Sequence, residues 1–215
     1  MENLESQFLL SFVIGQVKNN LFKISTQRLV LKRPDKTINK RLFASLVGDW
    51  DIAKCQSDVH YPYNQKHAEK FIKRSSPDDL RFSVFYDEIL VGGVGASFED
   101  NNELDLGYWI AKDYWGYGFA TEACIGLIEY IKNETDFETI TACYVKGNKA
   151  SANVLKKLGF IEIGECDEYF LSRKETMLCV DLILNLIINI RLEIIKNYSI
   201  IFFICYLLKK MDCLF

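Results

Sequence analysis

Two glycines, Gly116 and Gly118, separate a strand-like segment from a helix-like one in the stretch LGYWIAKDYWGYGFATEA, which runs from Leu106 to Ala123. Glycine lets a backbone approach a ligand closely and adopts positive φ without strain. The free N–H groups of such a turn and of the helix that follows point at one spot, where the helix dipole favours an anion. The chemistry that this segment predicts is binding of a pyrophosphate.

A G-x-G pair alone is a weak signal, and an ordinary strand-to-helix connection explains it as well. The sequence lacks the G-x-x-x-x-G-K-[ST] pattern of phosphate-binding loops. A second glycine cluster, Gly92, Gly93 and Gly95, lies inside a strand-like segment and does not open a helix. We expect a β-bulge or a close backbone approach at that cluster.

Other polar residues have simple structural explanations. Asn148 is expected to cap a helix, with Ser151 in the first turn of that helix. His60 and His67 are the only histidines, and both precede the strand-rich middle of the chain. They are weak candidates for catalysis, and His67 is expected on an exposed helix face.

The elements that must position these residues follow from periodicity and turn residues. Strands are predicted at 28–33, 81–86, 89–97, 103–111, 138–145, 160–165 and 175–182, and helices at 37–48, 66–74, 119–134 and 149–158. The pair Asp87-Glu88 is expected to form the turn of an antiparallel hairpin. This order predicts an α/β protein with a mixed sheet and helices on its faces.

Composition narrows the function further. The 215 residues are 49% hydrophobic and 26% charged, which suits one ordinary domain with some additional length. A formal charge of −3 argues against nucleic acid as the main ligand. None of the seven cysteines has C-x-x-C spacing, so we expect reduced thiols in a cytoplasmic protein and no metal site.

The two ends differ from the middle. Residues 1–24 are expected to be an extension and not a signal peptide, because acidic residues precede their apolar run. Residues 183–215 form an apolar tail that Arg191, Glu193 and Lys196 interrupt, so it does not predict a transmembrane helix. Packing on the domain or at a homodimer interface is favoured, while attachment to a membrane surface and the absence of any role stay open.

The turn also resembles the acetyl-CoA signature of the GNAT superfamily, [RQ]-x-x-G-x-[GA]. Trp115 takes its first place, Gly118 its fourth and Ala120 its sixth. Tryptophan departs from the general pattern but is similar to the RimJ/RimL-type branch, Y-W-G-x-G-[YF]-A-T-E-A. The stretches TQRLVLKRP, HYPYNQKHAEKFI and NKASANVLKKLGF resemble other segments of that branch. The resemblance covers about residues 25–182.

This resemblance implies the GNAT acyl-CoA N-acyltransferase fold, a mostly antiparallel sheet that splays at the cofactor site. The splay is expected beyond Tyr108, and the backbone N–H near Ile110 would face the thioester carbonyl as a small oxyanion site. Acetyl-CoA is the implied acetyl donor, with no metal. Its implied contacts are Trp109, Ile110, Trp115, Gly116, Tyr117, Gly118, Phe119, Ala120, Thr121, Asn148 and Ser151.

The mechanism implied by the resemblance is direct attack of an amine on the thioester, without an acyl-enzyme. Many GNAT enzymes use a tyrosine acid where this chain has Leu155, so Ser151 is the implied acid. Glu168 and Asp105 are the implied candidates for the general base, and each is also explained as a solvated strand residue.

The acceptor is expected to be a peptide N-terminus or a small amine. An α-amino group with a pKa near ~8 is about one-tenth neutral at pH 7, whereas a lysine is almost wholly charged. The alternative hypothesis is a non-catalytic acyl-CoA-binding or interaction module.

Overall fold

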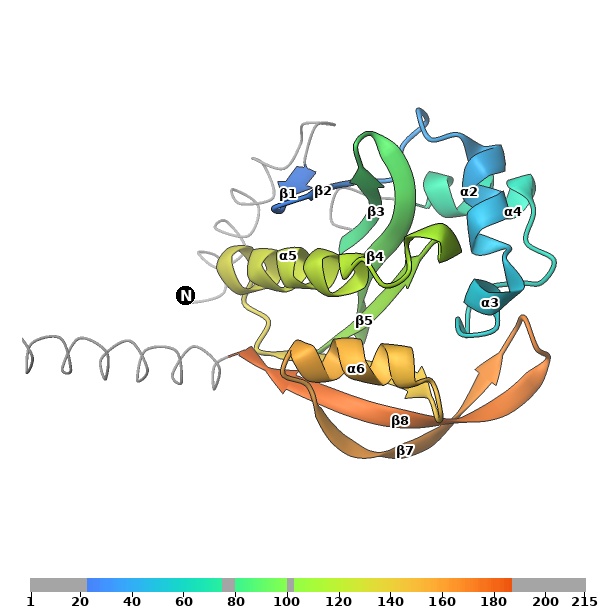
Figure 1. Cartoon of the computed structure of the whole chain (residues 1–215). Coiled ribbons are helices and arrows are strands. Elements are labelled where there is room, and N and C mark those ends of the chain that lie inside the picture. The colour runs from blue at the N-terminus through green and yellow to red at the C-terminus, as the bar shows by residue number, and fades with distance from the viewer. Residues whose placement is uncertain (1–22, 75–79, 100–102, 187–215) are drawn as a thin grey trace, which may run out of the picture.

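The computed structural model describes residues 23–74, 80–99 and 103–186. Its centre is an eight-stranded sheet in the order β1-β2-β3-β4-β5-β6-β8-β7, drawn in Figure 1. The strands are β1 (Lys23–Ser25), β2 (Leu29–Lys32), β3 (Leu80–Tyr86), β4 (Ile89–Glu99), β5 (Glu103–Ile110), β6 (Thr139–Val145), β7 (Ile161–Phe170) and β8 (Glu175–Asn185). Only the β5–β6 pair is parallel, so the predicted mixed, mostly antiparallel sheet is confirmed.

Helices cover the two faces of the sheet through separate hydrophobic clusters. The helices are α2 (Lys40–Val47), α3 (Trp50–Ala53), α4 (Gln65–Lys73), α5 (Phe119–Glu134) and α6 (Lys149–Lys157), with a 3-10 turn η2 (Lys112–Tyr114) before α5. On β5, Leu106 and Ile110 join the cluster of α5 and α6, and Tyr108 packs against it. Trp109 instead packs on the cluster of α2 and α4. Alternate residues of β5 therefore face different helix layers.

Most predicted helices are confirmed within a few residues. Helix α5 has the predicted bounds, whereas α2 begins at Lys40, later than predicted. The cause is Asn39, whose side chain accepts hydrogen bonds from the first N–H groups of α2 and fixes its start. The single turn α3, which Asp49 caps, was missed because four residues are too few to show periodicity.

The glycine cluster and the hairpin turn behave as predicted. Asp87 and Glu88 both have positive φ, 46° and 63°, as the two-residue turn between β3 and β4 requires. A register shift between β3 and β4 follows Val84. A Cβ added at Gly93 would lie 2.5 Å from Trp109 Nε1, so the backbone approaches this ring closely.

The β7–β8 hairpin is longer than predicted. Strand β7 extends to Phe170 and β8 to Asn185, beyond the expected ends at 165 and 182. Most of β7 is exposed on both faces, so its sequence lacks the alternation that marks a half-buried strand.

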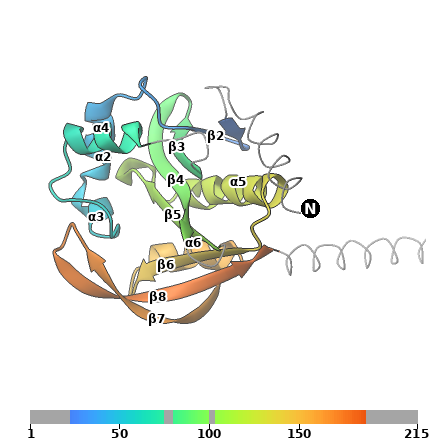
Figure 2. The ribbon, with the colours of Figure 1, turned by 180° about the vertical axis from the view of Figure 1, so that it is seen from behind.

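The splay between β5 and β6 is confirmed but lies earlier than predicted. These strands pair only from Glu103 to Asp105, opposite Thr139 to Thr141, and not as far as Tyr108. The reason is that β6 stays paired with β8 over its whole length while β5 stays paired with β4. Figure 2 shows the resulting division, with β6, β7 and β8 running away from β3, β4 and β5.

The expectations for the two ends fall mostly outside the described residues. Residues 1–22 and 187–215 are not described, so packing, dimer contacts and membrane attachment there stay predictions. Ile183 to Asn185 complete β8, and Leu186 is buried against the core. Within the described ranges, none of the helices has the length and apolar character needed to cross a membrane.

Candidate functional site

The splay opens a continuous cavity of about 1380 Å³ that reaches both faces of β5. The residues predicted to bind the donor line it, except Tyr117, whose side chain is 58% exposed. Ser151, Asp105 and Glu168 line it as well. The residues that the sequence predicts for donor binding and for proton transfer thus lie, with the exception of Tyr117, along one cavity.

The glycine turn has the backbone geometry that an anion site requires. Gly116 and Gly118 have φ of 83° and 81°, a region that side chains rarely adopt. Gly118 is the N-cap of α5, and no side-chain hydrogen bond caps this helix start. The first N–H groups of a sixteen-residue helix are thus available beside the cavity.

The Trp115 side chain links this turn to the preceding strand, β5, through a hydrogen bond. The indole Nε1 donates a 2.7 Å hydrogen bond to the carbonyl oxygen of Ile110. The tryptophan that replaces Arg or Gln in the signature therefore acts through its side chain. It holds the glycine turn against the end of β5.

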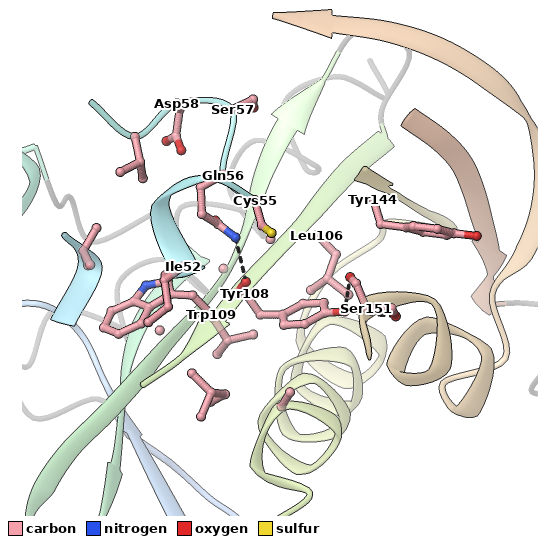
Figure 3. Close-up of a pocket in the computed structure, with 18 of the residues that line it drawn as sticks. Ile52, Cys55, Gln56, Ser57, Asp58, Leu106, Tyr108, Trp109, Tyr144 and Ser151 are labelled. Carbon is pink, nitrogen blue, oxygen red and sulfur yellow. Dashed lines mark hydrogen bonds between the residues drawn. The ribbon is translucent and has the colours of Figure 1, made fainter. Parts of the chain in front are cut away.

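The edge of β5 that faces the splay presents backbone groups to the cavity. The Tyr108 carbonyl oxygen accepts a 3.1 Å hydrogen bond from Gln56 Nε2, as Figure 3 shows. Because the N–H and C=O of one strand residue point to the same side, Tyr108 and Ile110 both face the gap. This arrangement supports the predicted position of the Ile110 N–H, and it matches an extended ligand that pairs with a strand edge.

Beside this edge lies a pair of hydroxyl groups that the sequence did not predict. The Tyr108 hydroxyl oxygen lies 2.7 Å from Ser151 Oγ (Figure 3). Burial raises the pKa of Tyr108 and outweighs the opposite effect of this hydrogen bond, so the phenol is protonated at neutral pH. Tyr108 could have been noticed from its alternation with Trp109, but its distance to Ser151 depends on where α6 packs.

The start of α6 confirms the predicted cap. Asn148 Oδ1 accepts a hydrogen bond from the Ser151 N–H at 3.2 Å, and Asn148 Nδ2 lies 3.6 Å from Cys55 Sγ. Leu155, in place of the usual tyrosine, is fully buried in the core. Ser151 and Tyr108 both place a hydroxyl group at this point of the cavity.

The two candidate bases both line the cavity, and both act on the same cysteine. Burial raises the pKa of Cys143 to about 12, and the charges of Asp105 and Glu168 contribute to this rise. Both carboxylates are therefore within electrostatic reach of one thiol. Asp105 has the same strand parity as Trp109, so it lies on the opposite face of β5 from Tyr108.

The histidines have structural partners. His67 Nδ1 accepts a 3.1 Å hydrogen bond from the Asn64 N–H and completes the capping box of α4. The ring of His60 stacks on that of His67 with 5.1 Å between centroids. His67 is half-buried and lines the cavity, so the expected exposed position is wrong. It is partly buried because it contacts both His60 and Tyr63.

An ion pair beside the glycine turn was also missed. Glu122 in the first turn of α5 accepts hydrogen bonds from the Thr26 hydroxyl, the Arg28 N–H and Arg28 Nε, each at 2.7 Å. The Arg28 guanidinium lies 4.9 Å above the Phe119 ring. These partners are far apart in the sequence, so no local pattern predicts that Arg28 neutralises the Glu122 carboxylate next to the glycine turn.

Gly107 leaves the other face of β5 open. It is exposed and lines the cavity, and a Cβ added there would meet no atom within 4 Å. It shares its strand face with Trp109 and Asp105, opposite the side of Tyr108. The hydroxyl pair and the carboxylates thus lie on opposite sides of one open strand edge.

Comparisons with known proteins agree with this geometry. Residues 28–161 match the family described as the acetyltransferase (GNAT) domain. YdaF of Bacillus subtilis, provisionally named a ribosomal N-acetyltransferase, is 36% identical over 88 residues, which are 40% of this chain and 48% of YdaF. The chain thus spans about half the length of this relative.

Solved structures show the same fold. A GNAT-family acetyltransferase from Bacillus anthracis has a TM-score of 0.67 at 18% identity, covering 77% of this chain and 99% of that one. RimJ from Mycobacterium smegmatis, solved in complex with CoA-disulfide, has a TM-score of 0.66 at 16% identity, covering 76% and 87%. The family match spans most of the described sheet and includes the glycine turn, β5 and α6. This chain belongs to the GNAT acetyltransferase family.

Proposed function

We propose that this protein transfers an acetyl group from acetyl-CoA directly to an amine, and that residues 25–182 form the catalytic domain. The observation that carries the proposal is the open edge of β5, which leads from Tyr108 to the uncapped start of α5. A long donor with amide groups at one end and a pyrophosphate at the other fits both features.

The pantetheine arm would pair with the Tyr108 backbone, and Gln56 must release the Tyr108 carbonyl when it does. The pyrophosphate would take the N–H groups of Gly116 to Ala120. The Ile110 N–H would face the thioester oxygen as negative charge develops on it. Arg28 supports this site by neutralising Glu122, which would otherwise repel the phosphates.

The departing thiolate would lie beside the Tyr108–Ser151 pair. With a pKa near ~8.5, a thiolate is a weaker base than the anion of a tyrosine whose pKa is raised. Full proton transfer from Tyr108 is therefore unfavourable, and the pair serves as a hydrogen-bond donor that stabilises the thiolate. Ser151 then connects Tyr108 to the end of α6.

The amine would approach from the face of Gly107, where Asp105 and Glu168 can accept its proton. Attack forms the C–N bond, breaks the C–S bond and releases CoA. A peptide α-amine is the favoured acceptor because it needs the least deprotonation at neutral pH. The name of YdaF agrees with a protein acceptor.

The test measures CoA thiol release from acetyl-CoA with peptides, polyamines and small amines, together with mass spectrometry of the products. We expect thiol release equal to the amount of acetylated amine for at least one acceptor. Acetyl-CoA binding without turnover for every amine would contradict catalysis and favour the binding-module alternative.

A further inference from the structure

Helix α4 presents a row of cationic side chains to the acceptor side of the cavity. His67, Lys70, Phe71 and Arg74 have i, i+3, i+4 and i+7 spacing, and all of them line the cavity. Lys66 and Lys73 of the same segment do not line it. Lys70 and Arg74 therefore face the cavity because of their positions on the helix, whereas the other lysines of α4 point elsewhere.

Arg81 of β3 extends this row across the sheet. Its Nη2 donates to the Arg74 carbonyl oxygen at 3.4 Å, and its guanidinium lies 5.0 Å from the centre of the Phe71 ring. A Cβ at Gly95 would lie 2.9 Å from Arg81 Cγ, so the Arg81 stem runs over Gly95. We call Lys70, Arg74 and Arg81 the cationic row.

His67 lies beside this row but adds no positive charge to it at neutral pH. Burial lowers the pKa of His67, and the charges of His60 and Lys70 lower it further. Among the residues that the structure describes, the carboxylates that line the cavity lie on other elements: Asp51, Asp58, Asp105 and Glu168. Asp51 is bound by Lys54 and Lys112, and Asp58 acts on Tyr63.

The sheet register places the cationic row at a defined distance from the transfer point. Arg81 pairs with Gly95, and Gly95 pairs with Gly107, which precedes Tyr108. Neighbouring strands lie about 4.8 Å apart, so Arg81 and Gly107 are roughly 10 Å apart along this line. An extended peptide covers that distance in about three residues.

We propose that the acceptor carries an anionic group about three residues from its reacting amine, and that the cationic row binds this group. In a peptide acceptor the anionic group is a carboxylate or phosphate side chain at the second to fourth residue. The proposal rests on the proposed amine acetylation and specifies the substrate class of that site.

The test compares kcat/KM for peptides that share a first residue and carry Glu, Gln, Lys or phosphoserine at residues two to four. We expect the acidic peptides to exceed the Lys peptide by about tenfold, with a smaller ratio at high salt. The Glu and phosphoserine arms distinguish a carboxylate from a phosphate. A small amine and its carboxylate-bearing analogue provide the same comparison outside peptides.

The variant Lys70→Gln/Arg74→Gln should lower kcat/KM for the acidic peptide by about three- to tenfold and leave the Gln peptide and the KM for acetyl-CoA unchanged. Lys66→Gln/Lys73→Gln removes the same charge from the same helix and should change nothing. Lys70→Glu/Arg74→Glu should reverse the preference. Turnover without charge preference would overturn this inference alone, whereas no turnover with any amine would overturn the proposed function and this inference with it.

Discussion

The Tyr108 hydroxyl oxygen lies 2.7 Å from Ser151 Oγ and joins the open edge of β5 to the first turn of α6. This contact lies on one face of β5, whereas Gly107 and Asp105 lie on the opposite face. The donor and acceptor sides should therefore respond differently to substitution.

Removal of either hydroxyl should slow transfer without weakening donor binding. We expect Tyr108→Phe and Ser151→Ala each to lower kcat about tenfold, about 1.4 kcal/mol, because the departing thiolate loses a hydrogen bond. The double variant should lose less than the sum, since the hydroxyls act as a pair. Steady-state kinetics with a fixed acceptor measure this, and strictly additive losses would show that the pair does not act together.

A side chain at Gly107 should block the acceptor and spare the donor. Gly107→Ala and Gly107→Val place progressively larger groups on the acceptor face, where no atom now lies within 4 Å. The acceptor KM should rise stepwise, reaching about tenfold or more for valine, while the Kd of acetyl-CoA stays constant. Gly164→Val on β7 is the matched control, because Gly164 is equally open and lies outside the cavity lining. Weaker acetyl-CoA binding by the Gly107 variants would place the donor on this face instead.

Gln56 should compete with the pantetheine arm. Its amide donates to the Tyr108 carbonyl, and breaking this bond costs binding energy. Gln56→Ala should therefore tighten acetyl-CoA binding by about two- to tenfold, which corresponds to about 0.5–1.5 kcal/mol for one hydrogen bond. Calorimetric titration measures the Kd, and weaker binding by the variant would show that Gln56 contacts the donor.

The sequence predicts the elements that depend on local signals, but not the contacts that depend on how distant segments pack. The bounds of α5 and the hairpin turn at Asp87 and Glu88 follow from local signals, so the sequence predicts both. Tyr108 was not predicted as a site residue, because its contact with Ser151 depends on how α6 packs. The start of the splay at Asp105 depends on β6 following β8, which no local pattern encodes.

The ion pair of Arg28 and Glu122 was not predicted either, because its two residues are far apart in the sequence. From this pair we expect the stability of the fold to depend on pH. Burial acts to raise the pKa of Glu122, but the hydrogen bonds from Thr26 and Arg28 outweigh burial and lower the pKa below its usual value. The pair therefore stabilises the fold above the unfolded-state pKa of about 4.3, and this contribution is lost as pH falls through the lower folded-state value.

Glu122→Gln should lower the free energy of unfolding by about 1–2 kcal/mol near pH 7, allowing for the partly exposed guanidinium. The difference from wild type should shrink below about pH 4.3. Urea unfolding at several pH values measures it, with Glu129→Gln on the exposed face of α5 as the control. A difference that does not change with pH would contradict the charge-based explanation.

The central claim is that acetyl-CoA lies along the β5 edge with its pyrophosphate at the start of α5. Residue-resolved amide hydrogen exchange, with and without acetyl-CoA, tests this directly and needs no knowledge of the acceptor. We predict slower exchange at the N–H groups of Tyr108, Ile110 and Gly116 to Ala120, and unchanged exchange along β7. Acetyl-CoA binding that leaves these N–H groups unprotected would contradict the claim.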